Sequence, residues 1–132
     1  MLAYEGIAEK LTDRVPELGD RTAERFEEFR DDETGGLLAY PVFGDVFQPF
    51  LFRLLDENRV GEVMVRTFAF LEEMAESTDR AVYDLLGIEV LEPLLHDPKR
   101  LLLAWPHMKV KMREQIRETA GFQGVERNVS AE

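Results

Sequence analysis

Hydrophobic residues recur at helical spacing along most of the chain, and no segment shows the period-two alternation of a half-buried strand. The clearest pattern covers residues 60–76, where one arc carries Val60, Val63, Met64, Thr67, Phe68, Leu71, Met74 and Ala75. Charged side chains occupy the opposite arc. Similar stripes predict further helices over 4–15, 18–29, 46–55, 79–96 and 98–121, the last bent or restarted at Pro106. We therefore expect an all-α fold of about six helices.

The length of 132 residues and the hydrophobic content of 45% suit one domain with its own core. Gly121 is placed to end the last helix, so we predict a single helical domain over residues 1–121 and a flexible tail over 122–132. No unit of roughly 20 to 50 residues repeats convincingly. The pattern fits an irregular antiparallel bundle and a short HEAT-like helical stack equally well.

Several residues mark where helices begin or end. Gly19-Asp20 is the expected start of the second helix, and the acidic, glycine-containing segment 31–36 is a predicted solvated loop. Pro49 must lie in the first turn of its helix or kink it. Residues 77–79 and Asp97-Pro98 carry the side chains expected of helix N-caps.

Acidic residues dominate the charge: 27 Asp and Glu stand against 16 Lys and Arg, for a net charge of -11. The balance is -6 over residues 1–35, -8 over 36–98 and +3 over 99–132. Such a surface argues against binding a nucleic-acid backbone. It keeps a protein soluble, and it can also attract a cationic partner.

The sequence also bears on compartment. No apolar run approaches the length of about 18 residues that a membrane span needs, and the first residues lack the pattern of a signal peptide. We therefore expect a cytoplasmic protein without a membrane role. The absence of cysteine excludes disulfides, thiol catalysis and cysteine-ligated metal sites.

The segment 79–96 is anomalous, because its apolar face turns around near Gly87. In one continuous helix, Glu89, Glu92 and His96 would share a side with core leucines, and their carboxylates would need donors or a metal. We favour a break at Gly87 that leaves both glutamates exposed, because burying unpaired carboxylates is costly. Pro93 also disfavours a continuous helix. The less favoured alternative is a metal- or small-molecule-binding bundle that uses Glu89, Glu92 and His96.

Catalytic motifs are missing from the sequence. It contains no nucleophile elbow, no phosphate loop with lysine, no zinc-protease motif and no plausible Ser–His–Asp set. We therefore predict a protein that is not an enzyme and needs no cofactor.

Phe52 and Phe70 lie off the main apolar stripes of their helices. Each of them either packs against a further helix or forms an exposed anchor for a partner.

The segment from Leu38 to about Glu118 resembles an uncharacterised family of small, acidic, all-helical bacterial proteins, some of which look like toxin-immunity proteins. The similarity is carried by Leu-Ala-Tyr-Pro-Val-Phe-Gly-Asp at 38–45, Phe-Leu-Glu-Glu-Met-Ala at 70–75, and Leu-Leu-Gly-Ile-Glu-Val-Leu-Glu-Pro-Leu-Leu at 85–95. By this resemblance Asp45, Glu72 and Glu92 organise helix ends or meet the partner.

The resemblance implies a cytosolic immunity protein that neutralises a cognate bacterial toxin through an acidic face, without catalysis. An adaptor or regulatory protein with another partner is the main alternative. An acidic face would provide both steering and charge complementarity toward a cationic toxin cleft. The oligomeric state stays open. The residues expected to meet the partner are Asp45, Asp56, Glu57, Glu72, Glu73, Glu76, Glu92, Phe52 and Phe70. The acids of residues 17–33 belong to the same expected acidic surface.

Overall fold

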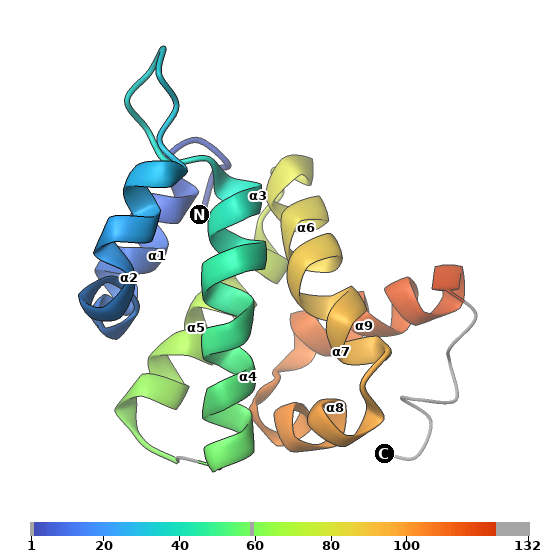
Figure 1. The fold of residues 1–132 in the computed structure, drawn as a ribbon. Helices are drawn as coiled ribbons and strands as arrows, with labels where there is room; N and C mark the ends of the chain where they lie inside the picture. The colour runs from blue at the N-terminus through green and yellow to red at the C-terminus, as the bar shows by residue number, and fades with distance from the viewer. Residues whose placement is uncertain (1, 59, 124–132) are drawn as a thin grey trace.

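Helices form nearly all of the regular structure (Figure 1). The computed structural model describes residues 2–58 and 60–123, with the backbone alone for 20–24 and 122–123. The elements are α1 (Ile7–Arg14), α2 (Pro16–Glu28), α3 (Ala39–Pro41), η1 (Val42–Phe47), α4 (Gln48–Glu57), α5 (Glu62–Glu76), α6 (Arg80–Leu86), η2 (Gly87–Leu91), α7 (Glu92–Leu95), α8 (Pro98–Ala104), η3 (Trp105–His107) and α9 (Val110–Gln123). The expected all-α class is confirmed.

The predicted N-caps at Asp79 and Asp97 are found in the structure, whereas the third helix begins at Ala39 rather than at 46. The Asp79 carboxylate accepts a hydrogen bond from the Ala81 N–H at 3.0 Å, and Asp97 caps α8 in the same way. The prediction for the second helix was wrong, because α2 begins at Pro16 rather than at Gly19-Asp20. Proline suits this first turn, where its missing N–H would have no partner within the helix.

The segment 31–36 is a loop, as expected, but it is held by several hydrogen bonds. Arg30 and Leu37 form an isolated antiparallel bridge. The Arg30 guanidinium donates to the Gly35 carbonyl at 2.7 Å, and Gly35 has a φ of 75°, which glycine adopts without strain. The loop projects from one end of the molecule in Figure 1.

Two long helices contain a π-helical segment. Helices α3, η1 and α4 form one continuous stretch, and α6, η2 and α7 form another. Each π segment ends two residues before a proline, Pro49 or Pro93. The sequences at these positions are alike, Asp-Val-Phe-Gln-Pro-Phe-Leu at 45–51 and Glu-Val-Leu-Glu-Pro-Leu-Leu at 89–95. The chain therefore contains a short internal repeat that periodicity along the sequence does not reveal.

The predicted break at Gly87 was wrong. Gly87 has right-handed helical angles, φ -60° and ψ -50°, and the helix continues through η2 into α7. The π segment adds one residue to a turn, so Leu86 and Leu91 share the buried face although they are five positions apart. This extra residue accounts for the apparent reversal of the apolar face.

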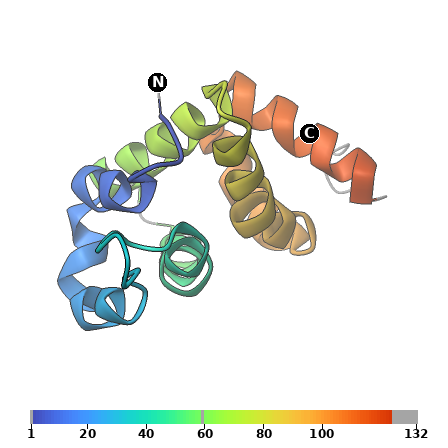
Figure 2. The same ribbon diagram turned by 90° about the horizontal axis from the view of Figure 1, so that it is seen from above.

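The helices are arranged in two layers. Helix α5 contacts both α1 and α9 on one side, while η1 contacts α2 and η2 on the other. Viewed from above, the layers follow a curve (Figure 2). The helices α3–α4 and α6–α7 run in the same direction, as successive units of a helical stack do. Of the two predicted architectures, the short HEAT-like stack describes this arrangement better than the bundle.

One continuous hydrophobic core joins the layers, and Phe43, Phe47 and Phe70 are among its largest fully buried side chains. Among the described residues, no helix has both the length and the apolar character needed to cross a bilayer. Helix α9 continues to Gln123, so Gly121 lies within it rather than at its end. The predicted tail falls mostly outside the described residues.

Candidate functional site

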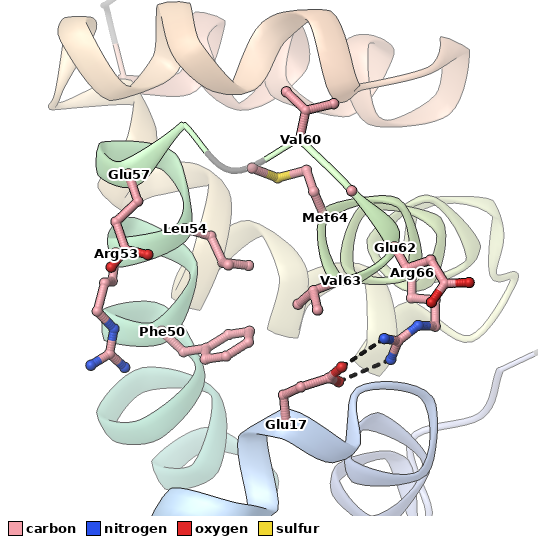
Figure 3. Close-up of a pocket in the computed structure, with 11 residues that line it drawn as sticks. Glu17, Phe50, Arg53, Leu54, Glu57, Val60, Glu62, Val63, Met64 and Arg66 are labelled. Atoms are coloured by element: carbon pink, nitrogen blue, oxygen red, sulfur yellow. Dashed lines mark hydrogen bonds and ion pairs between the residues drawn. The ribbon is translucent and has the colours of Figure 1, made fainter.

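A cleft of about 560 Å³ lies between α4, the start of α5 and the first turn of α2 (Figure 3). Phe50 and Leu54 line it from α4, and Val63 and Met64 line it from α5. The cleft volume lies within the range of about 300–1,000 Å³ that is typical of ligand pockets. Its walls are apolar and its rim is charged.

The mouth of the cleft lies beside the connection between the two helices. Asn58 ends α4 in the left-handed conformation, with φ 51°, and Gly61 stands immediately before α5. Val60 is 78% exposed at the mouth of the cleft, because α5 begins only at Glu62. A Cβ placed on Gly61 would meet no atom within 4 Å, so the mouth is unobstructed at this point.

An ion pair between Arg66 and Glu17 joins α5 to α2 along the rim. Two guanidinium nitrogens of Arg66 donate to the two carboxylate oxygens of Glu17, at 2.7 and 2.9 Å, as Figure 3 shows. The hydrogen bond from Arg66 is the main reason that the pKa of Glu17 lies below its ordinary value. Both side chains remain more than a third exposed, so the pair positions the rim more than it stabilises the fold.

Charges of both signs complete the rim. Glu57 and Glu62 carry negative charge at the ends of α4 and α5, and Arg53 carries positive charge on α4. An apolar centre with a polar border is the usual composition of a protein–protein contact site. Of the residues predicted to lie on the partner surface, Glu57 and Glu17, the first of the acids of residues 17–33, line this cleft.

Asp56 and Phe52 face α8 and share one contact, Arg100. The Arg100 guanidinium donates to both Asp56 carboxylate oxygens, at 2.8 and 2.9 Å. The same guanidinium lies 4.6 Å from the centroid of the half-buried Phe52 ring. The hydrogen bond from Arg100 lowers the pKa of Asp56. Both predicted partner residues therefore have an intramolecular role, which is to hold α4 against α8.

Glu72 also has a structural role. Its carboxylate accepts hydrogen bonds from the backbone N–H groups of Lys109, Lys111 and Met112, at 2.7 to 3.1 Å, and its residue is only 8% exposed. These N–H groups belong to the start of α9 and have no partners within that helix. Glu72 thus organises a helix end, one of the two roles implied by the resemblance, and its burial contradicts its predicted place on a binding face.

Glu73 and Glu76, the two acids that follow Glu72 on α5, differ in their exposure and in their partners. Glu73 is half-buried and forms a bidentate ion pair with Arg14, which links α5 to α1 and keeps the pKa of Glu73 below its usual value. Glu76 is exposed. Of the three acids predicted to form an acidic face, Glu72, Glu73 and Glu76, only Glu76 is exposed.

Phe70 is fully buried, with 0% exposure, so its assignment as an accessible anchor for a partner was wrong. Of the two predicted possibilities for Phe70, packing against a further helix is confirmed. The guanidinium of Arg14 lies 5.8 Å from the ring centroid and covers the ring near the α1–α5 contact. An aromatic side chain off the main stripe is buried here because α5 has neighbours on more than one side.

The two π segments bring acids together. Glu89 is half-buried over Gly44, where a Cβ would lie 2.3 Å from the Glu89 carboxylate oxygen. Burial, followed by the nearby charges of Asp45 and Glu92, raises the pKa of Glu89. Gly44 is thus the residue that leaves room for Glu89, while Asp45 is exposed and Glu92 is half-buried.

His96 is exposed at the end of α7. Across the described parts of the chain, no three His, Asp or Glu side chains are placed to hold a metal ion. The predicted set of Glu89, Glu92 and His96 is therefore not assembled as ligands.

The cleft itself was missed by the sequence reasoning. Periodicity assigns its wall residues to the apolar stripes of two helices, but it carries no information on whether those stripes meet or diverge. The one available signal was Val60, which extends the apolar arc of 60–76 beyond the first residue of α5.

Comparison with known proteins identifies a family but no activity. No curated protein and no solved structure matches the chain. The model of a family described as a domain of unknown function, DUF7674, matches residues 8–124. That match includes every helix from the first turn of α1 to the end of α9. The chain therefore belongs to the DUF7674 family.

Proposed function

We propose that this protein is a non-enzymatic protein-binding module whose partner inserts a nonpolar side chain into the α4–α5 cleft. The supporting observation is the cleft itself, with apolar walls from Phe50, Leu54 and Val63 inside a charged rim. Binding energy at protein interfaces is concentrated where a partner's anchor side chain fills a pocket and excludes water.

In its more specific form, the proposal makes the partner a cognate bacterial toxin domain, and the chain its cytosolic immunity protein. The net charge of -11 supports a cationic partner, because opposite charges accelerate association. We assign local charge complementarity to Glu57 and Glu62, because both are exposed beside the cleft. An adaptor with another partner remains the alternative, and the product of the neighbouring gene separates the two.

The experiment uses the full chain and the purified product of that neighbouring gene. The immunity form predicts a toxin domain, a Kd in the nanomolar range, and protection of cells that express the toxin. Gly61→Phe places a ring at the unobstructed mouth of the cleft, and Val63→Glu places a charge on its wall. Each should weaken binding at least tenfold while far-UV circular dichroism is unchanged.

The controls match these substitutions in kind. Gly121 also has open space around it, so Gly121→Phe serves as the control for Gly61→Phe. Leu102 is 70% exposed on α8, so Leu102→Glu serves as the control for Val63→Glu. Unchanged affinity in both cleft variants would reject the cleft as the binding site.

Salt provides a second measurement. Replacing Glu57 and Glu62 by Gln should lower the association rate at low ionic strength, and the difference from the wild type should shrink at high salt. Equal association rates at low salt would show that these two acids only solvate the surface.

A further inference from the structure

The segment 109–111, at the start of α9, presents Val110 on the surface between two lysines. Val110 is 68% exposed, and both lysines are exposed as well. The residues on either side of the segment, Met108 and Met112, are buried, at 3% and 0% exposure. The chain thus holds an apolar side chain on its surface in a segment that is anchored at both ends.

Glu72 fixes the position of the 109–111 segment relative to α5. Its carboxylate accepts hydrogen bonds from the backbone N–H groups of Lys109 and Lys111, at 2.9 and 2.7 Å. A segment whose backbone is already ordered loses little conformational freedom when it binds. Glu72 follows Glu62, at the cleft, by ten positions on α5, so it lies about 15 Å further along the helix. The segment is therefore held away from the cleft of its own chain.

The α4–α5 cleft has the complementary surface. Phe50 and Val63 are half-buried on its two walls and Val60 is exposed at its mouth, so an inserted side chain can reach all three. Figure 3 shows Glu57 and Glu62 on opposite sides of this mouth. The volume of about 560 Å³ exceeds what one valine fills, which leaves room for the methylene groups of lysines. An apolar centre between two acids therefore matches an apolar side chain between two lysines.

The other charges on the rim do not oppose this match. Arg66 is already paired with Glu17, and the Arg53 side chain extends away from the cleft in Figure 3. The net charge of -11 makes whole chains repel each other. Salt screens this repulsion over about 8 Å at physiological ionic strength, so the contacts at the cleft decide whether two copies associate.

We propose that, when no partner is bound, the cleft receives the 109–111 segment of a second copy of this chain. Val110 enters between the two apolar walls, and the flanking lysines lie beside Glu57 and Glu62. The segment and the cleft are different surfaces of the chain, so the contact joins copies head to tail. The inference rests on the proposed protein-binding function of the cleft and adds its regulation, because self-association competes with the partner for the same site.

Analytical ultracentrifugation of the full chain tests the proposal without an identified partner. At physiological salt, the weight-average mass should rise above the 15.2 kDa of one chain as the concentration is raised to about 1 mM. Val110→Gln, which removes the inserted side chain, and Gly61→Phe, which fills the mouth of the cleft, should each weaken self-association at least tenfold with unchanged far-UV circular dichroism. A wild type that stays monomeric at every concentration would overturn the proposal.

Leu102→Gln is the matched control for Val110→Gln, because Leu102 is 70% exposed on the neighbouring helix α8. It should leave self-association unchanged. Equal weakening by the two substitutions would overturn the proposal, since any exposed apolar side chain would then have the same effect.

Mixing the two interface variants tests the head-to-tail arrangement. The Val110→Gln chain keeps an intact cleft, and the Gly61→Phe chain keeps an intact 109–111 segment. An equimolar mixture should therefore form dimers of one chain of each kind, although each variant alone stays monomeric. A mixture that stays monomeric while the wild type associates would overturn the proposal, because the copies would then use another arrangement.

Self-association and partner binding are measured separately, so the two hypotheses remain distinguishable. A chain that stays monomeric but loses its partner through Gly61→Phe supports the proposed function and overturns the self-association. A chain that associates through Val110 while its cleft variants all retain the partner supports the self-association and rejects the cleft as the partner's site. If both occupy the cleft, saturating partner should convert the oligomers into complexes with one copy of this chain. Oligomers that persist with the partner bound would overturn the competition.

Discussion

Glu72 shows how one side chain can connect distant elements. It lies on α5, yet its carboxylate serves three backbone N–H groups at the start of α9. A carboxylate at this position also interacts favourably with the helix dipole. The acid is therefore part of the fold, although its sequence context resembles that of a surface charge.

Replacing Glu72 by Ala should lower the free energy of unfolding by about 2 kcal/mol, because a helix cap is lost and buried N–H groups lose their acceptor. Urea unfolding followed by circular dichroism measures this change. Glu76→Ala on the same helix is the matched control and should change stability by less than about 0.5 kcal/mol. Equal effects of the two substitutions would contradict the capping role.

Glu89 should make the stability depend on pH. Its pKa is raised in the folded state by burial and by Asp45 and Glu92, so the folded protein binds a proton more tightly than the unfolded chain does. The contribution of Glu89 to stability is therefore greatest below its unfolded pKa and falls as pH rises through its folded pKa.

Glu89→Gln removes this titration. At pH 7 the variant should be more stable than the wild type, by less than about 1 kcal/mol because the site is partly solvated. The gain should fade as the pH is lowered to where Glu89 is protonated in both states. Glu5→Gln, at an exposed position, is the control, and a Glu89→Gln gain that persists unchanged at low pH would refute the interpretation.

The paired π segments explain how helices with internal prolines remain intact. Pro93 has no N–H, so the carbonyl of Glu89 lacks its regular helical donor. The side-chain nitrogen of Gln48, on the other repeat segment, donates to this carbonyl at 3.1 Å. Gln48 on one helix thus satisfies a backbone carbonyl of the other helix, and this contact adds to their apolar packing.

A double-mutant cycle tests this compensation. Gln48→Ala should destabilise the wild type by about 1 kcal/mol. In a Pro93→Ala background, residue 93 again has an N–H, so the effect of Gln48→Ala should be clearly smaller. Effects that add without coupling in urea unfolding would show that Gln48 does not replace the missing donor.

The domain as a unit depends on α5, which contacts α1, α6 and α9. Ion pairs reinforce two of its connections, since Arg14 binds Glu73 and Arg66 binds Glu17. A stack whose ends share one central helix should unfold in one step, whereas a longer array can melt unit by unit.

Trp105, the single tryptophan, reports on this cooperativity. It lies in η3 beside α9, where the guanidiniums of Arg113 and Arg117 approach its ring at 4.8 and 5.2 Å. Its fluorescence should change at the same urea concentration as the far-UV circular dichroism of all helices. A separate fluorescence transition would show that the α8–α9 end unfolds independently.

The amino-acid order alone was enough to specify helices, their main apolar stripes and several caps, because these depend on spacing within a few residues. Asp79 and Asp97 could be placed for that reason, whereas Pro49 was expected in a first turn or at a kink and lies inside the continuous stretch of α3, η1 and α4. The conformation at Gly87 could not be predicted in this way, since glycine is compatible with both a helix break and a π turn. Packing of η2 against η1 decides between the two.

Which charges are free and where the surface is hollow were settled only when the helices packed. Glu72 and Glu76 are four positions apart on one helix, yet one is buried beneath α9 and the other is exposed. The cleft exists because α4 and α5 turn apolar stripes toward each other without closing the space between them. Burial and cavity shape depend on residues that are distant in the chain, and the spacing of apolar residues within one helix does not reveal which distant residues these are.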